Sequence, residues 1–122
     1  MKKISKNYLK GFSILERFFL HSSEVEELDG DLFKYNSLLH YINISYNEKL
    51  NHIGEGILKG VNDYEQISFA NNLCVNSYTP KDDLPTLIEK LEDECPSKTR
   101  FERLGDGITS LSSKFQKFIT NL

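Results

Sequence analysis

The chain has 122 residues, with 15 basic and 18 acidic side chains and a formal net charge of −3. This length predicts one domain, spanning residues 1–122, that can bury a hydrophobic core without needing disulfide bonds or a metal ion for stability. Hydrophobic residues make up 39% of the chain and charged residues 27%, which argues against wholesale disorder. No apolar run reaches the roughly 18 residues that a membrane-spanning helix needs, so no membrane contact is expected.

The compartment is predicted from the N-terminus and the two cysteines. The apolar stretch 14–20 contains Glu16 and Arg17, which are out of place in a secretory signal peptide. Cys74 and Cys95 do not have CxxC spacing. A single bridge between them is an alternative, but without a signal peptide we expect two reduced thiols in a cytoplasmic protein.

The apolar residues recur at steps of three and four along most of the chain, which is the period of an amphipathic helix. These stripes predict helices over 5–20, 31–42, 45–61, 63–74, 83–95 and 97–122. Residues 40–46, at the C-terminal end of the second predicted helix, alternate apolar and polar residues. A short strand is therefore the alternative interpretation of this segment. We find no internal repeat at a fixed period. The fold class expected is therefore all-α, a compact single-domain bundle of about five to six short helices.

One local feature supports a predicted helix, and another argues against a very stable one. Asp82 or Asp83 can cap the helix that starts with Leu84 and Pro85, and Cys95-Pro96 ends it. The run 54–60 contains three glycines in a GxGxxxG pattern, which differs from a phosphate-binding loop. Close approach of two helices at these small residues is the preferred interpretation.

Candidate catalytic chemistry is sparse. Glu48, His52 and Glu55 would share one face of a helix, where a histidine between two carboxylates could act as a base or as half of a metal site. A solvated helix face is favoured, because a two-metal bundle needs two Glu-x-x-His pairs, whereas the order here is His52-x-x-Glu55. We predict no catalytic residues, no metal, no cofactor and no small-molecule substrate.

The charge is distributed in blocks. Residues 1–20 carry five basic residues against Glu16, and residues 97–122 carry five basic residues against two acidic ones. The two acidic blocks are residues 21–31 and 81–96. Their carboxylates are the predicted partner-binding residues: Glu24, Glu26, Glu27, Asp29, Asp31, Asp82, Asp83, Glu92, Asp93 and Glu94. The structural alternative is that the basic ends pair with the acidic blocks inside the molecule.

Carboxylates together with tyrosines suit a basic protein partner, since charge steers the encounter and aromatic side chains supply binding energy. The tyrosines available as anchors are Tyr35, Tyr41, Tyr46, Tyr64 and Tyr78. This profile of size, charge and missing catalytic motifs resembles that of bacterial immunity proteins and antitoxins. The resemblance implies an inhibitor or adaptor that occludes the active site of a nuclease-type toxin.

The alternative function is a helical nucleic-acid binder or transcriptional regulator. It would use the basic C-terminal helix, whose cations are Arg100, Arg103, Lys114 and Lys117. The negative net charge and the sequence pI near 5.6 weigh against binding to phosphate backbones. Nucleic acid is therefore the less favoured partner.

Overall fold

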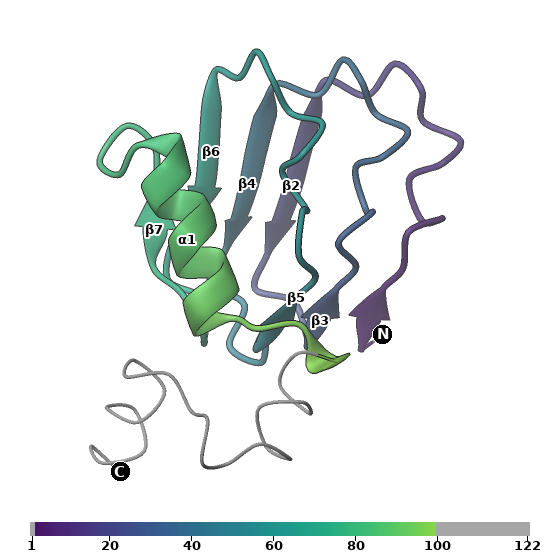
Figure 1. Ribbon diagram of the computed structural model, residues 1–122. Coiled ribbons are helices and arrows are strands. Elements are labelled where there is room, and N and C mark those ends of the chain that lie inside the picture. The colour runs from purple at the N-terminus through teal and green to yellow at the C-terminus, as the bar shows by residue number, and fades with distance from the viewer. Residues whose placement is uncertain (1, 100–122) are drawn as a thin grey trace, which may run out of the picture.

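The computed structural model describes residues 2–99, and this part of the chain forms seven strands and one helix. The chain alternates between two sheets as it advances (Figure 1). One sheet contains β1 (Lys3–Ile4), β3 (Glu27–Leu28) and β5 (His52–Ile53). The other contains β2 (Arg17–His21), β4 (Tyr41–Ser45), β6 (Gln66–Phe69) and β7 (Ser77–Tyr78). The helix α1 spans Leu84–Glu94.

The strands before β7 belong to three stacked coils that run in the same direction. Lys3 pairs with Glu27, and Glu27 pairs with His52, in parallel register. The offset between coils is therefore 24 residues from position 3 to 27, and 25 residues from position 27 to 52. Arg17 and Tyr41 pair with the same first offset in the larger sheet. The described fold is a short solenoid, in which each coil contacts mainly its neighbours.

The same spacing of residues recurs in every coil. The three segments are Leu15-x-x-Phe18-x-Leu20-x-x-Ser23, Leu39-x-x-Ile42-x-Ile44-x-x-Asn47 and Tyr64-x-x-Ile67-x-Phe69-x-x-Asn72. Such spacing is typical of leucine-rich repeats of about 20–29 residues. Turns, rather than helices, connect the two sheets within each coil here.

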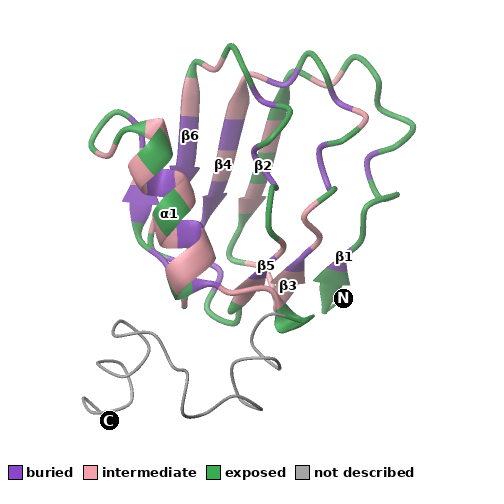
Figure 2. Ribbon diagram, in the orientation of Figure 1, coloured by how far each residue is buried: buried purple, intermediate pink, exposed green. Residues whose placement is uncertain are grey.

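The core lies between the two sheets. Ile42, Ile44 and Ile67 point into it and have no exposed surface, whereas the residues between them in each strand point away. Leu28 and Leu32 close the core from the other sheet and the following turn. Figure 2 shows buried residues along β4, β6 and the facing coils, with more exposed residues along the first coil.

A ladder of polar side chains joins the three coils inside this core. The fully buried Asn47 accepts hydrogen bonds from the backbone amide and hydroxyl of Ser23, at 2.9 and 2.7 Å. Its amide nitrogen donates to the Leu20 carbonyl at 3.0 Å and to Asn72 Oδ1 at 3.0 Å. Asn72 in turn donates to the Ile44 carbonyl at 2.8 Å. These bonds satisfy buried backbone groups where the chain leaves each strand.

The C-terminal end of the described stack is closed by β7, α1 and a disulfide. β7 pairs antiparallel with β6, and α1 buries Leu87 and Leu91. Cys74 and Cys95 form a disulfide with a Cα–Cα distance of 5.3 Å. The prediction of two reduced thiols is therefore wrong, because the fold brings the end of α1 back against the third coil.

The prediction of an all-α bundle is wrong, because the described chain is an α/β fold made mostly of strands. The prediction of one domain over residues 1–122 stays a prediction. The stripes assigned to helices over 5–20, 31–42, 45–61 and 63–74 are coil segments. Each turn of a coil brings an apolar residue to the interior every few positions, which imitates the helical period. The expectation of no repeat also fails, since the offset of 24 and 25 residues is regular.

Two local predictions are confirmed. The strand alternative at 40–46 is β4 (Tyr41–Ser45). The helix expected before Cys95-Pro96 is α1, and Asp83 is its N-cap. The prediction that two helices approach each other at the glycines is wrong, because Gly54 meets Gly30 of the neighbouring coil and neither residue is in a helix. The predicted helix over 97–122 lies almost entirely outside the described residues.

None of the helical segments in the described part of the chain has both the length and the apolar character that crossing a membrane requires.

Candidate binding face

The face of the larger sheet that points away from the core carries a group of aromatic and basic side chains in contact with one another. We call this surface, formed by Arg17, Phe19, His21, Tyr41 and Asn43, the outer face. These residues alternate with inward-pointing ones along β2 and β4, because successive side chains of a strand lie on opposite sides of the sheet. Phe19 is 53% exposed although it lies in a regular strand.

Aromatic contacts organise the outer face. The rings of Phe19 and Tyr41 lie 5.2 Å apart between centroids, and those of Phe19 and His21 lie 6.0 Å apart. The Arg17 guanidinium lies 5.0 Å from the centre of the Tyr41 ring. Such contacts between a cation and a ring, and between rings, hold the side chains in place while leaving their outer surfaces open.

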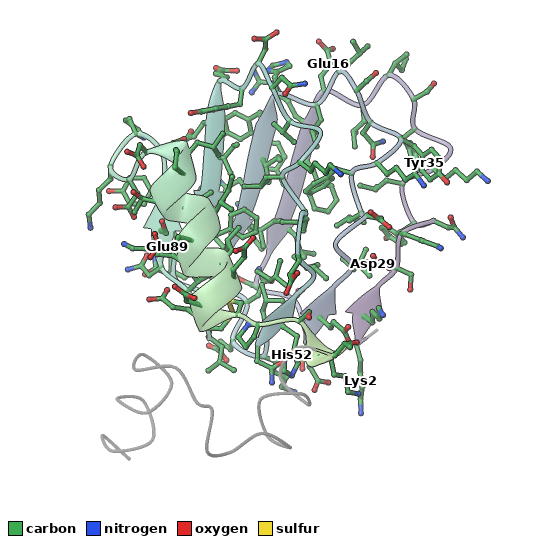
Figure 3. The ribbon with its side chains drawn as sticks, in the orientation of Figure 1. Lys2, Glu16, Asp29, Tyr35, His52 and Glu89 are labelled. Carbon is green, nitrogen blue, oxygen red and sulfur yellow. A yellow bond between two sulfur atoms is a disulfide. The ribbon has the colours of Figure 1, made fainter. Side chains whose placement is uncertain are left out.

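A charged cluster borders the outer face where β2 and β4 begin. Arg17 forms an ion pair with Glu65 at 3.2 Å. His40 lies 3.7 Å from Glu16 and 3.5 Å from Glu65. Figure 3 shows Glu16 at the end of the sheet away from Lys2 and His52. The cluster fixes Arg17 over the aromatic rings.

A polar pocket of about 400 Å³ lies where β2 and β4 end. Ser22, Tyr46 and Asn71 follow the strands of the three coils at equivalent positions, and all three have positive φ, between 51° and 59°. The pocket is also lined by the ion pair of Glu24 with Lys49. The hydrogen bond from Lys49, followed by its charge, lowers the pKa of Glu24.

The first predicted acidic block has local partners in the structure. Glu24 pairs with Lys49, and Glu27 lies 3.4 Å from Lys3. Asp29 accepts hydrogen bonds from the backbone amides of Lys6, at 3.1 Å, and Asp31, at 2.9 Å. The remaining members differ in exposure, as Glu26 is half-buried and Asp31 is exposed. The self-repulsion that suggested an external partner is thus relieved within the molecule.

The second predicted acidic block lies on and before α1. Asp82 accepts hydrogen bonds from the Ser77 hydroxyl at 2.6 Å and from Lys90 at 3.0 Å, and these bonds lower its pKa. Glu92, Asp93 and Glu94 form the last turn of the helix. Asp29 and the α1 residue Glu89 lie on opposite sides of the molecule in Figure 3, so the structure does not gather the two blocks into one surface.

Asp83 gives a prediction for the pH dependence of stability. Hydrogen bonds from the Thr86 side chain and backbone amide lower the pKa of Asp83. Its ionised form therefore stabilises the fold above the unfolded-state pKa of about 4, and this contribution disappears as the pH falls below that value. Asparagine also caps helices but does not titrate. The measurement is the midpoint of thermal unfolding from pH 7 to pH 2. At pH 7 the midpoint of the wild type should exceed that of Asp83→Asn, and this difference should vanish toward pH 2. Asp83→Ala should have a lower midpoint than Asp83→Asn at every pH.

The group of Glu48, His52 and Glu55 does not form the helix face that the sequence suggested. His52 lies in β5, and its Nδ1 is 2.8 Å from the Pro96 carbonyl oxygen, while both glutamates are exposed in turns. Among residues 2–99, no group of three histidine, cysteine, aspartate or glutamate side chains could hold a metal ion. The basic residues proposed for nucleic-acid binding lie outside the described residues.

The outer face contains residues that the sequence interpretation missed. Only Tyr41 was among the predicted anchors. The signal was present in Arg17-Phe18-Phe19-Leu20-His21, where apolar inward residues alternate with outward residues that are large. A strand interpretation of this segment would have placed Phe19 on an exposed surface.

Comparison of the chain with protein-family models, with curated proteins and with solved structures finds no match.

Proposed function

We propose that the protein is a binding module that recognises another protein through the outer face. The cluster of the exposed Phe19 and Arg17 with the half-buried Tyr41 is the observation that supports this function. Tyrosine and arginine are enriched among residues that dominate binding energy, and aromatic residues are enriched in interfaces. The rigid strands hold these side chains in place, so little conformational entropy is lost when a partner binds.

The narrower proposal is an inhibitor of a basic, nuclease-type toxin, as in immunity proteins and antitoxins. It is supported by Glu24 and Glu48, which line the pocket where the strands of the outer face end. A basic partner on the outer face would also contact these carboxylates, and association would then weaken as salt increases. A nucleic-acid-binding function has no comparable support among residues 2–99.

The compartment is proposed from the disulfide. Cytoplasmic location was predicted from the lack of a signal-peptide pattern, and it led to the expectation that Cys74 and Cys95 are reduced. Their bridge supports a compartment in which disulfides persist, such as the periplasm, the endoplasmic reticulum or the extracellular space.

The test compares the wild type with Phe19→Ser/Tyr41→Ser. A partner captured from the source cells is identified and purified, and its Kd for each variant is measured by calorimetry. The double variant should bind at least about 30-fold more weakly, because both substitutions remove predicted hot-spot side chains. Leu73→Ser is the matched control, since Leu73 is 60% exposed but lies in a turn after β6. An unchanged Kd for the double variant would contradict the proposed function.

A further inference from the structure

The first coil exposes apolar residues at positions that the other coils bury. Tyr8 is 51% exposed, whereas the equivalent Leu32 and Ile57 are 0% and 4% exposed. Phe12 is 57% exposed, whereas the equivalent Val61 is 5% exposed. These are core positions of the repeat, and in the first coil no described residue covers them from the outer side.

The conformation of this exposed segment is held from the second coil. Asn36, which is 3% exposed, donates hydrogen bonds to the Leu9 carbonyl at 3.1 Å and to the Phe12 carbonyl at 2.9 Å. Leu9 is itself buried. The backbone around Phe12 is therefore fixed, and its exposure belongs to the folded structure.

The strands of the first coil also have an open side. Within residues 2–99, β1 pairs only with β3, and β2 pairs only with β4. The inward residues of β2, Phe18 and Leu20, are only half-buried, whereas their neighbours in β4 are fully buried. Such an edge offers a row of backbone amides and carbonyls to a further strand.

The charge of the first coil restricts what can bind at this edge. Lys2, Lys6 and Lys10 are exposed, and none forms an ion pair with a described residue. Lys10 lies 5.5 Å from the centre of the Tyr35 ring. In Figure 3, Lys2 lies at the end of the stack opposite Glu89 of α1. A two-fold dimer through this edge would bring like charges together, which argues against a second copy as the occupant.

We propose that the first coil is a docking surface for an acidic, extended segment of a partner protein, which adds a strand beside β2. Its alternate apolar side chains cover Phe18 and Leu20, and its negative charge matches the positive charge that the three lysines give to the first coil. We call this surface, formed by Tyr8, Phe12 and the free edge of β2 together with the three lysines, the N-terminal surface. The inference does not depend on the function proposed for the outer face.

The experiment uses two synthetic peptides of about nine residues, the length of a strand. One alternates valine with glutamate, and the other alternates valine with lysine. Each is titrated into the labelled full chain, and amide shifts are followed by NMR spectroscopy. The glutamate peptide should shift amides of residues 2–21, and the lysine peptide should shift none of them. In the Lys6→Glu/Lys10→Glu variant, the glutamate peptide should bind about tenfold more weakly.

The controls use the repeat itself. Lys59 occupies the position equivalent to Lys10 in the third coil, so Lys59→Glu should leave peptide affinity within about twofold of the wild type. Phe12→Ser should weaken binding, whereas Tyr41→Ser should leave it unchanged because Tyr41 lies on β4, away from the free edge of β2, which separates this surface from the outer face. Equal binding of the lysine peptide, shifts confined to other coils, or a concentration-dependent doubling of mass without peptide would each overturn the proposal.

Discussion

Replacing Gly54 with alanine should lower the free energy of unfolding by about 3 kcal/mol, because it forces two backbones apart. A Cβ atom at Gly54 would lie 2.1 Å from the Gly30 nitrogen and 2.6 Å from the Gly30 Cα. Neither backbone can move freely, since the Gly54 amide donates to the Leu28 carbonyl at 2.8 Å. The second and third coils would have to separate at the point where β3 pairs with β5.

Gly60→Ala is the matched control for this substitution. Gly60 belongs to the same coil, but a Cβ atom there would have no neighbour within 4 Å. Alanine at this position should be neutral or stabilise the protein by up to about 1 kcal/mol, because it restricts the unfolded chain. Urea unfolding of both variants measures the difference. If Gly54→Ala and Gly60→Ala unfold at the same midpoint, the coils do not pack as closely as described.

Replacing Asn47 with alanine should cost about 3 to 4 kcal/mol of stability. The substitution leaves the part-buried Ser23 amide and Leu20 carbonyl without their partner, and an unsatisfied buried group costs about 1–3 kcal/mol. It also removes the side-chain hydrogen bond from Asn47 to Asn72, whereas the bond from the Asn47 backbone amide to Asn72 remains. The measurement is again the free energy of unfolding in urea.

Asn51→Ala provides the comparison, because Asn51 is exposed and only its backbone amide is hydrogen-bonded, to the Glu26 carbonyl. Its cost should stay below about 0.5 kcal/mol. The double variant Asn47→Ala/Asn72→Ala should cost less than the sum of the single variants, since both side chains belong to one network. Strict additivity would show that the ladder does not act as a unit.

Much of the core could be predicted from the sequence even though its secondary structure could not. Leu50, Ile53, Ile57, Leu58 and Val61 were all assigned to one apolar stripe, and all are buried. A helix and a tightly turning coil both place residues at steps of three and four in the interior. The stripe therefore identified what is buried without identifying the backbone that buries it.

The first predicted helix shows how this ambiguity misplaces a surface. Its stripe contained Tyr8, Phe12 and Phe19, which are all more than half exposed. The residues that pack in or against the core are Leu9, which the stripe missed, and Leu15, Phe18 and Leu20, which belonged to it. The decisive signal was long-range, because Asn47 and Asn72 recur with the same apolar neighbours one coil apart. A period of about 24 residues is visible only when whole segments are compared.

The prediction of α1 succeeded because its signals are local. Asp83 accepts a hydrogen bond from the Thr86 amide, and Pro85 lies in the first turn, where no amide donor is needed. The acidic residues, by contrast, were grouped by their nearness in sequence. Glu27 and Asp29 instead find partners in Lys3 and Lys6, one coil away. These contacts agree with the alternative interpretation, in which the basic N-terminal end pairs with the first acidic block inside the molecule. The coil stacking that brings the partners together could not be read from the charge pattern.

The unequal length of the coils has a consequence for how this architecture can grow. The extra residue of the longer coils lies between Asn47 and Leu50, because Ser23 and Val25 are only two positions apart in the first coil. This place is outside both sheets, so the change in length leaves the register of every strand intact. Residues 27–51 therefore form one complete coil, which pairs in parallel register with the coil on each side. Tandem duplication of these residues would lengthen the molecule by one coil while preserving both of its ends.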